Sequence, residues 1–186
     1  YPRELATVAP WPVFGNHEGV SSDAQSQTGP YFEMFSLPRN AEAGGVASST
    51  EAYFAYESGD LHVVQLDSAE SALAPGSPML TWLAIDLAAN TRPWTIVAFH
   101  HPPYTKGTHD SDDPADSGGI MKRMRENVLP ILEAHGVDLV LTGHSHGYER
   151  SFLIDGHYGT TDTFDPATML RNGGDGDPDG DGAYTK

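Results

Sequence analysis

Cysteine is absent from the 186-residue chain, and basic residues are few. Without cysteine there is no disulfide, no thiolate zinc site and no thiol nucleophile, so any bound metal must sit on nitrogen and oxygen ligands. Ten Lys and Arg stand against 26 Asp and Glu, a formal net charge of -16. Such a surface repels a phosphate backbone, and we therefore expect no nucleic-acid partner.

Long apolar runs are also missing. No run approaches the ~20 residues that cross a bilayer, and residues 1–4 do not resemble a signal peptide, so we expect no membrane partner. The length suits one domain with a substantial core. A hydrophobic fraction of 38% is compatible with a packed protein, while 20 glycines and 14 prolines predict many loops.

The apolar segments alternate between strand-like and helix-like patterns. Residues 5–14 predict a short buried strand that ends at Gly15. Residues 52–56 and 61–66 are β-prone and flank a Ser-Gly-Asp turn, which predicts an antiparallel hairpin. Pro78 opens a segment with helical spacing, and residues 94–99 read as a central buried strand.

The same alternation continues toward the C-terminus. Residues 120–135 place their apolar positions on one helical face, and Pro130 should kink or interrupt that helix. Residues 137–142 form the next β-prone run. Alternating strands and helices indicate an α/β fold, with each candidate motif at the carboxyl end of a strand, where such sheets place their ligands.

Three separated segments offer imidazole or amide ligands directly after an apolar run. They are Asn16 with His17, His100 with His101, and His144 with His146. In His-x-His both side chains leave an extended backbone on the same side, so His144 and His146 can face one cleft and bind different ions of a close pair. A lone histidine is usually a surface or hydrogen-bonded imidazole, but the joint pattern favours a metal site.

The sequence here resembles the calcineurin-like metallophosphoesterases, and within them the purple acid phosphatases. The resemblance rests on three motifs, Gly15-Asn16-His17-Glu18, Val97-Ala98-Phe99-His100 and Gly143-His144-Ser145-His146-Gly147-Tyr148-Glu149-Arg150. It implies part of a four-layer α/β/β/α sandwich with mixed sheets flanked by helices. Residues 1–186 would be the C-terminal portion of the catalytic domain, with residues 172–186 an acidic, Gly-rich tail or loop.

The same resemblance implies a role for each motif residue. Asn16, His100 and His144 would bind one transition-metal ion, and His146 would bind a second; iron, zinc and manganese all remain open. His17 would lie at the substrate phosphate, where it stabilises the phosphate or donates a proton.

Two further histidines have alternative interpretations. His109 stands near the place where purple acid phosphatases carry a histidine that contacts the phosphate or the leaving group; a solvated loop histidine is the alternative. His101 would lie behind the ligands or contact the substrate, because the motif register selects His100 as the ligand. The segment Tyr148-Glu149-Arg150 would brace its loop.

The function implied is hydrolysis of a small phosphate ester, as in an acid phosphatase acting on phosphomonoesters. A metal-bound hydroxide would attack phosphorus in line at a dinuclear centre. A phosphodiesterase or nucleotidase of the same superfamily is one alternative. A non-catalytic fragment retained as a binding or structural module is another.

Two aspartate motifs that the resemblance predicts upstream are missing before Gly15. We therefore expect the chain to be a fragment, with an N-terminal segment or a second chain supplying the aspartates. The isolated chain should bind metal weakly and show little activity. We expect a secreted or periplasmic location for the protein.

The tail contains the opening of a calcium loop, Asp-x-Asp-x-Asp-Gly, formed by Asp175, Asp177 and Asp179. Lys186 stands where the twelfth-position Glu belongs. Calcium binding is thus one interpretation, and an acidic Gly-rich loop is the other.

Overall fold

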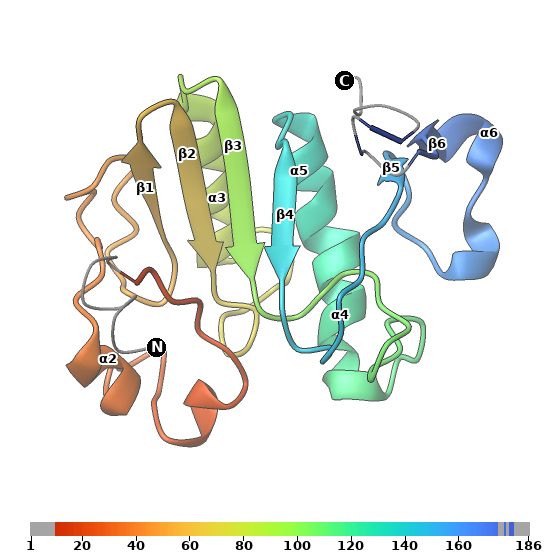
Figure 1. The fold of residues 1–186 in the computed structure, drawn as a ribbon. Coiled ribbons are helices and arrows are strands. Elements are labelled where there is room, and N and C mark those ends of the chain that lie inside the picture. The colour runs from red at the N-terminus through yellow and green to blue at the C-terminus, as the bar shows by residue number, and fades with distance from the viewer. Residues whose placement is uncertain (1–9, 175–176, 178, 181–186) are drawn as a thin grey trace.

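A mixed four-stranded sheet is the centre of the computed structural model, which describes residues 10–174, 177, 179 and 180. The strands are β1 (Phe54–Ser58), β2 (Leu61–Leu66), β3 (Trp94–Phe99) and β4 (Leu139–Thr142), in the spatial order β1-β2-β3-β4 (Figure 1). β1 and β2 form the predicted antiparallel hairpin, while β2, β3 and β4 run parallel. The prediction of an α/β fold with a mixed sheet is confirmed.

Helices cover one face of this sheet. α3 (Pro78–Ala89) lies behind β2 and β3, and α4 (Ile120–Arg123) and α5 (Leu129–Ala134) lie behind and beside β4 (Figure 1). Buried side chains of the sheet and helices form the main core, including Val64, Leu66, Val97, Phe99, Leu83, Met124 and Leu132. Burial of these apolar groups is the main favourable contribution to this layer.

The segment predicted as one helix over residues 120–135 is interrupted. A π-helical turn, Met124–Val128, separates α4 from α5. Pro130 has no N–H to donate to the carbonyl of Glu126, so the regular α-helical ladder cannot continue through it. The predicted interruption by Pro130 is confirmed, and its form is a π-turn.

The predicted strand over residues 5–14 is wrong for its described part, because residues 10–14 form no strand. Pro10 and Pro12 lack the N–H groups that a ladder needs. Side chains hold the segment instead: Gln65 Nε2 donates to the Trp11 carbonyl at 2.9 Å, and the Trp11 ring stacks on Tyr56 with centroids 4.3 Å apart. The first motif thus reaches the site from a loop that packs on β1 and β2.

That packing is completed by the short helix α2 (Pro30–Met34). Its Tyr31 hydroxyl donates to the Pro12 carbonyl at 2.9 Å, and the Tyr31 ring meets Phe14 edge to face at 5.0 Å. Phe14 is fully buried directly before Gly15. This aromatic cluster therefore fixes the chain just ahead of Asn16.

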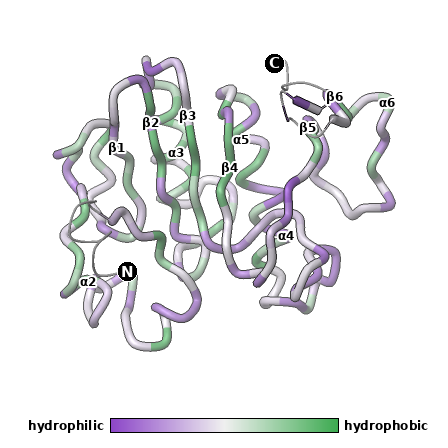
Figure 2. Tube along the Cα trace, in the orientation of Figure 1, coloured by the Kyte–Doolittle hydropathy of each residue, from purple (hydrophilic) through white to green (hydrophobic). Residues whose placement is uncertain are grey.

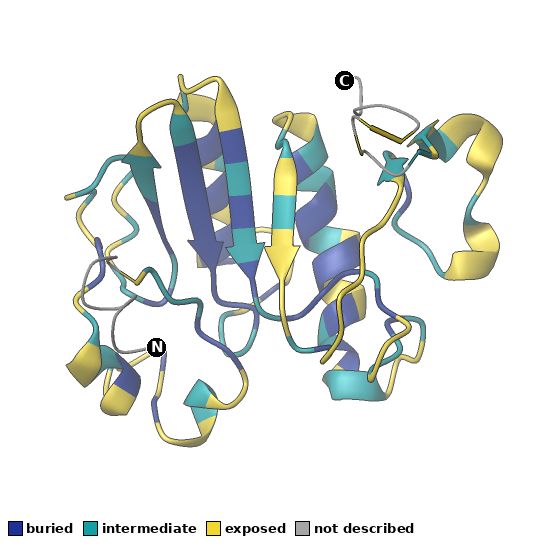
Figure 3. Cartoon of the chain, viewed as in Figure 1, coloured by how far each residue is buried: buried dark blue, intermediate teal, exposed yellow. Residues whose placement is uncertain are grey.

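β4 is the last strand in the sheet order, with no strand on its outer side among the described residues. Its Leu139 and Leu141 are 47% and 50% exposed. β4 is therefore apolar in Figure 2 and largely exposed in Figure 3. The opposite half of the same face, over β1 and β2, is the half that residues 10–14 cover.

The remaining elements are short. β5 (Leu153–Ile154) and β6 (Leu170–Asn172) form a two-stranded ribbon beside α6 (Pro166–Met169), and 3-10 turns span Glu18–Val20, Asp116–Gly119 and Thr161–Thr163. No helix in the described part of the chain has the length and apolarity to cross a membrane. The parallel strands β2, β3 and β4 all end at one edge, and the loops that follow them carry Ser68, His100 and His144.

Candidate active site

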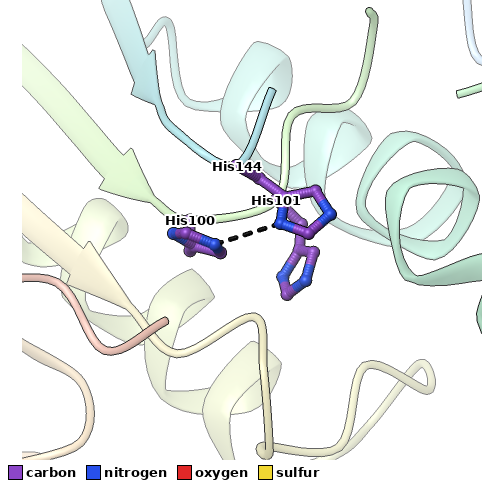
Figure 4. A group of neighbouring side chains, drawn as sticks. All are labelled: His100, His101 and His144. Carbon is purple, nitrogen blue, oxygen red and sulfur yellow. Dashed lines mark hydrogen bonds between the residues drawn. The ribbon is translucent and has the colours of Figure 1, made fainter. Parts of the chain in front are cut away.

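Three polar atoms from distant segments meet at this edge. The Asn16 Oδ1 atom lies 2.6 Å from His100 Nε2 and 3.3 Å from His144 Nδ1, and the two histidine nitrogens are 3.1 Å apart. Figure 4 shows His100 and His144 facing one another, with His101 beside them. Three of the four predicted metal ligands are therefore gathered at one point.

Gly15 allows the backbone to pass close to this cluster. A Cβ at Gly15 would lie 2.8 Å from His100 Nδ1 and 2.9 Å from Glu18 Oε2, whereas a Cβ at Gly143 would meet His100 Nδ1 at an ordinary 3.5 Å. Glu18 Oε2 accepts from the Gly15 N–H at 3.0 Å, which closes the turn. His144 itself has φ +62, a left-handed conformation that costs about 1–3 kcal/mol and is typical of functional sites.

The orientation of His144 is set by two residues behind it. Ser117 donates its hydroxyl hydrogen to Asp116 Oδ1 at 2.8 Å, and the Ser117 oxygen lies 2.7 Å from His144 Nε2. With its hydrogen committed to Asp116, Ser117 accepts from Nε2–H. The other ring nitrogen, Nδ1, therefore carries the lone pair that faces His100 and Asn16.

This donor set fits a metal ion. Ligand atoms about 2.0–2.1 Å from a tetrahedral ion lie ~3.3 Å from one another, close to the spacings among the three atoms here. The 2.6 Å contact between Asn16 and His100 would have to open by several tenths of an ångström. Amide oxygen and neutral imidazole are ligands for zinc, iron or manganese.

Burial keeps the clustered imidazoles neutral. It lowers the pKa of His101 to about 3 and that of His144 to about 4, and it also lowers the pKa of His100, with the neighbouring histidines adding to each shift. A neutral imidazole has the free lone pair that a metal ion needs. At neutral pH these imidazoles are therefore in the form that a cation site requires.

His101 is buried beneath the cluster. Its backbone N–H donates to Ser68 Oγ at 3.0 Å, and its Nδ1 lies 2.9 Å from the same oxygen. Its ring centroid is 4.4 Å from that of His144. Ser68 follows β2 as His101 follows β3, so the contact joins two neighbouring strand ends.

His109 packs against the ring of His144. The two rings stack with centroids 4.0 Å apart and an interplanar angle of 23°. His109 Nδ1 is 2.9 Å from Asp116 Oδ1, and Asp116 Oδ2 accepts from the Asp110 N–H at 2.8 Å. The hydrogen bond from the Asp110 N–H lowers the pKa of Asp116 most, and the bonds from His109 and Ser117 lower it further, to about 2. The carboxylate therefore stays ionised beside both imidazoles.

His17 and His146 are exposed and stand at the margin. Among the described residues, neither side chain makes a hydrogen bond with the cluster, and His146 is tied only through its backbone N–H to Thr108 Oγ1 at 3.0 Å. Both are near enough for their charge to lower the pKa of His100. The role of His17 as a substrate contact and the role of His146 as a ligand of the second ion remain predictions.

The loop that carries His109 is fixed from two sides. Glu149 Oε1 accepts from the Lys106 N–H at 2.9 Å, and Oε2 accepts from the Thr105 hydroxyl. Arg125, only 1% exposed, donates from Nη1 to the Pro103 carbonyl at 3.2 Å and from Nε to the Tyr158 carbonyl at 3.3 Å. Arg125 comes from the π-helical turn, so that turn supplies a support of the site loop.

Sequence reasoning missed Ser68, Asp116 and Ser117. Ser68 could have been found, because it follows a parallel strand just as His100 and His144 do. Asp116 could not be singled out, since three other aspartates precede it in the same loop at positions 110, 112 and 113. Of the predicted calcium residues, Asp175 lies outside the described residues, so the structure does not describe that motif.

Comparison with known proteins agrees with the motifs. Residues 3–148 match the family model described as calcineurin-like phosphoesterase. Purple acid phosphatase 18 of Arabidopsis thaliana is 32% identical over 161 residues, covering 82% of this chain and 33% of that protein. Purple acid phosphatase 15 of the same plant is 33% identical over 143 residues, covering 75% of this chain and 24% of that protein.

A solved purple acid phosphatase from yellow lupin seeds aligns with a TM-score of 0.49 at 16% identity, over 71% of this chain and 24% of that structure. The chain thus spans a third or less of the length of these relatives. The family match covers more than half of the chain and includes the first two motifs and residues 143–148 of the third. The chain belongs to the calcineurin-like phosphoesterase family.

Proposed function

We propose that the protein containing this chain hydrolyses phosphomonoesters in the manner of an acid phosphatase, at a centre of two iron, zinc or manganese ions. The observation that carries the proposal is the convergence of Asn16 Oδ1, His100 Nε2 and His144 Nδ1 within 2.6–3.3 Å of one another. These three residues would hold one ion, and His146 would contribute to the second.

Bound ions would supply Lewis acidity toward the phosphoryl oxygens and a hydroxide nucleophile from water. The chain's own residues supply orientation. Asp116 and Ser117 set the tautomer of His144, and Gly15 lets the backbone pass close behind the His100 ring. A ligand set held in this way would need little rearrangement when an ion binds.

Proton transfer would fall to His17 and His109. Because Asp116 accepts from His109 Nδ1–H, His109 Nε2 is the nitrogen left for an oxygen of the substrate. His17 is exposed beside Asn16 and is free to approach the phosphate. Either imidazolium could protonate the departing alcohol.

The carboxylates that would offset the charge of the ions are proposed to come from an N-terminal segment or a second chain. Asp67 follows β2 at the site edge but is fully buried and already accepts from the N–H groups of Ala69, Glu70 and Ser71 at 2.8–3.0 Å. It is therefore committed to its own turn. The relatives, which are three to four times longer than the aligned segment, have room for further ligands.

The experiment compares the full-length gene product with the 186-residue chain. Metal content is measured first, and then hydrolysis of phosphomonoesters, phosphodiesters and nucleotides. We expect bound metal and monoester turnover in the full-length product, both strongly reduced by His100→Ala and His144→Ala. His135→Ala is the matched control, because His135 is exposed directly after α5 and, among the described residues, its side chain bonds only to the Ile131 carbonyl.

Unchanged metal content and turnover in both site variants would contradict the proposal. Preference for diesters would assign the protein to the phosphodiesterase alternative. Metal binding without turnover in the full-length product would favour a binding module.

A further inference from the structure

A cavity of about 180 Å³ opens beside the histidine cluster. Its polar lining is Asn16, His101 and Glu70, and its apolar wall comes from Val20, Ala69 and Ile120, with Gly19 completing it. Asn16 is a proposed metal ligand and His101 is predicted to lie behind the ligands or contact the substrate, but no part of the substrate has been assigned to this space. Since Asn16 belongs to the proposed metal site, whatever fills the cavity lies next to the bound phosphate.

The first step concerns the hydrogen on His101. Ser68 is 1% exposed and accepts from the His101 backbone N–H, and its own hydrogen has only His101 Nδ1 as acceptor among the described residues. A buried hydroxyl hydrogen without an acceptor is costly, so Ser68 donates to Nδ1. The ring hydrogen of His101 therefore sits on Nε2, which has no hydrogen-bond partner in the described part of the chain. His101 is a fixed donor available to a ligand.

The second step concerns the charge of the cavity. Glu70 is held in place because its Oε2 accepts from the Ala24 N–H at 2.7 Å. No lysine or arginine lines the cavity. A phosphate or carboxylate group would thus be repelled from it, whereas a neutral or cationic group would not.

The third step concerns size. A cavity of about 150 Å³ with apolar walls accepts benzene, so this one can hold a group of about one aromatic ring. Apolar contacts would come from Val20 and Ile120. A second fused ring would extend beyond the residues that line the cavity.

We propose that this cavity binds the alcohol part of the phosphate ester, with His101 as its hydrogen-bond donor and Ser68 as the residue that positions His101. The preferred substrates are monoesters of small, uncharged or cationic alcohols, up to one aromatic ring. This inference rests on the proposed phosphoesterase function, because it assumes that phosphate binds at Asn16.

The tautomer is tested by nitrogen NMR of the full-length product labelled with ¹⁵N-histidine. The His101 signals are assigned by their loss in His101→Phe. We expect hydrogen on Nε2 in the unchanged protein, and a mixture of tautomers in Ser68→Ala. Hydrogen on Nδ1 in the unchanged protein would overturn the assignment.

Occupancy is tested with two non-hydrolysable ligands that differ only in the ring, phenylphosphonate and methylphosphonate. We expect phenylphosphonate to bind roughly ten times more tightly and to shift the His101 Nε2 signal, because its ring would be buried. Val20→Trp should remove that preference by filling the cavity, whereas the control Met34→Trp, at a residue that does not line the cavity, should leave it unchanged. Val20 is 83% exposed and Met34 is 76% exposed, so neither change should disturb the fold.

Charge is tested with a phenylphosphonate that carries a ring carboxylate. It should bind more weakly than phenylphosphonate. Glu70→Gln, which keeps an acceptor for the Ala24 N–H, should reduce this difference in affinity between the two ligands. Equal affinities for the phenyl and methyl ligands, or an unchanged preference in Val20→Trp, would refute the inference. These binding results do not depend on turnover, so absence of hydrolysis would count against the proposed function alone.

Discussion

Ser117 Oγ lies 2.7 Å from His144 Nε2, and the same hydroxyl donates to Asp116. The contact assigns the hydrogen of the His144 ring to Nε2 and its lone pair to Nδ1. One partly buried serine thus decides which nitrogen of His144 faces Asn16 and His100. Loss of this contact should lower the affinity for metal, because residues that hydrogen-bond to metal ligands commonly contribute 10–100-fold to that affinity.

Ser117→Gly should therefore weaken metal binding by roughly 10–100-fold. Ser117 has φ +50, so glycine removes the hydroxyl without adding backbone strain. Ser117→Ala should give the same loss of metal affinity. Equal metal affinity in Ser117→Gly and the unchanged protein, measured by competition with a chelator, would rule out this role.

Gly15→Ala should also weaken metal binding, by roughly tenfold or more. The new methyl group would lie 2.8 Å from His100 Nδ1, so the ring would have to move. Gly143→Ala is the matched control, because its methyl group would meet the same ring at 3.5 Å, an ordinary contact. Equal affinities in these two variants would show that the His100 ring is not held by Gly15.

Arg125→Met should lower the free energy of unfolding by about 1–3 kcal/mol, because two carbonyls lose their buried donor and Asp112 loses one of its two cationic partners. Arg125 Nη1 lies 3.2 Å from Asp112 Oδ1 and also donates to the Pro103 carbonyl. Lys122→Met, which removes an exposed ammonium 3.7 Å from Glu126, should change stability by less than ~0.5 kcal/mol. Urea unfolding of both variants provides the measurement; a similar small effect in both would contradict the support assigned to Arg125.

The metal-free protein should lose stability as the pH falls below 6.5. Burial lowers the pKa of His144 to about 4 and of His101 to about 3, from an ordinary 6.5. Between these values the unfolded chain binds protons that the folded chain does not, so the free energy of unfolding falls with falling pH. Urea midpoints at pH 7 and pH 4.5 measure the loss, and His101→Phe should reduce it. A midpoint independent of pH would contradict the lowered pKa values.

Much of the fold could be predicted because local pattern and tertiary packing agree. The run from Trp94 to Phe99 is apolar, short and followed by histidine, and it forms the strand β3 at the centre of the sheet. The strand predicted before the first motif does not form in residues 10–14. Pro12 has no N–H to donate, so this apolar segment cannot join a β-ladder. The site edge was predictable for His100 and His144, which both follow parallel strands.

The supports of the site were not predictable in the same way. Ser68, Asp116 and Ser117 act through contacts with His101, His109 and His144, and these depend on loop conformations that no periodicity encodes. Three left-handed residues in succession, Ser117, Gly118 and Gly119, bring the hydroxyl to His144. Glycine adopts this conformation readily, whereas serine seldom does. Residue type therefore gave no reason to expect it at Ser117.

The open edge of β4 has a consequence for handling the 186-residue chain. Backbone groups of β4 that no other strand pairs among the described residues lie beside the exposed Leu139 and Leu141, and they form a template on which a second copy can add a strand. Mutual repulsion between copies, each with a net charge of -16, opposes this pairing. Since salt shortens the range of that repulsion, concentrated buffers should promote self-association and dilute ones should preserve single molecules.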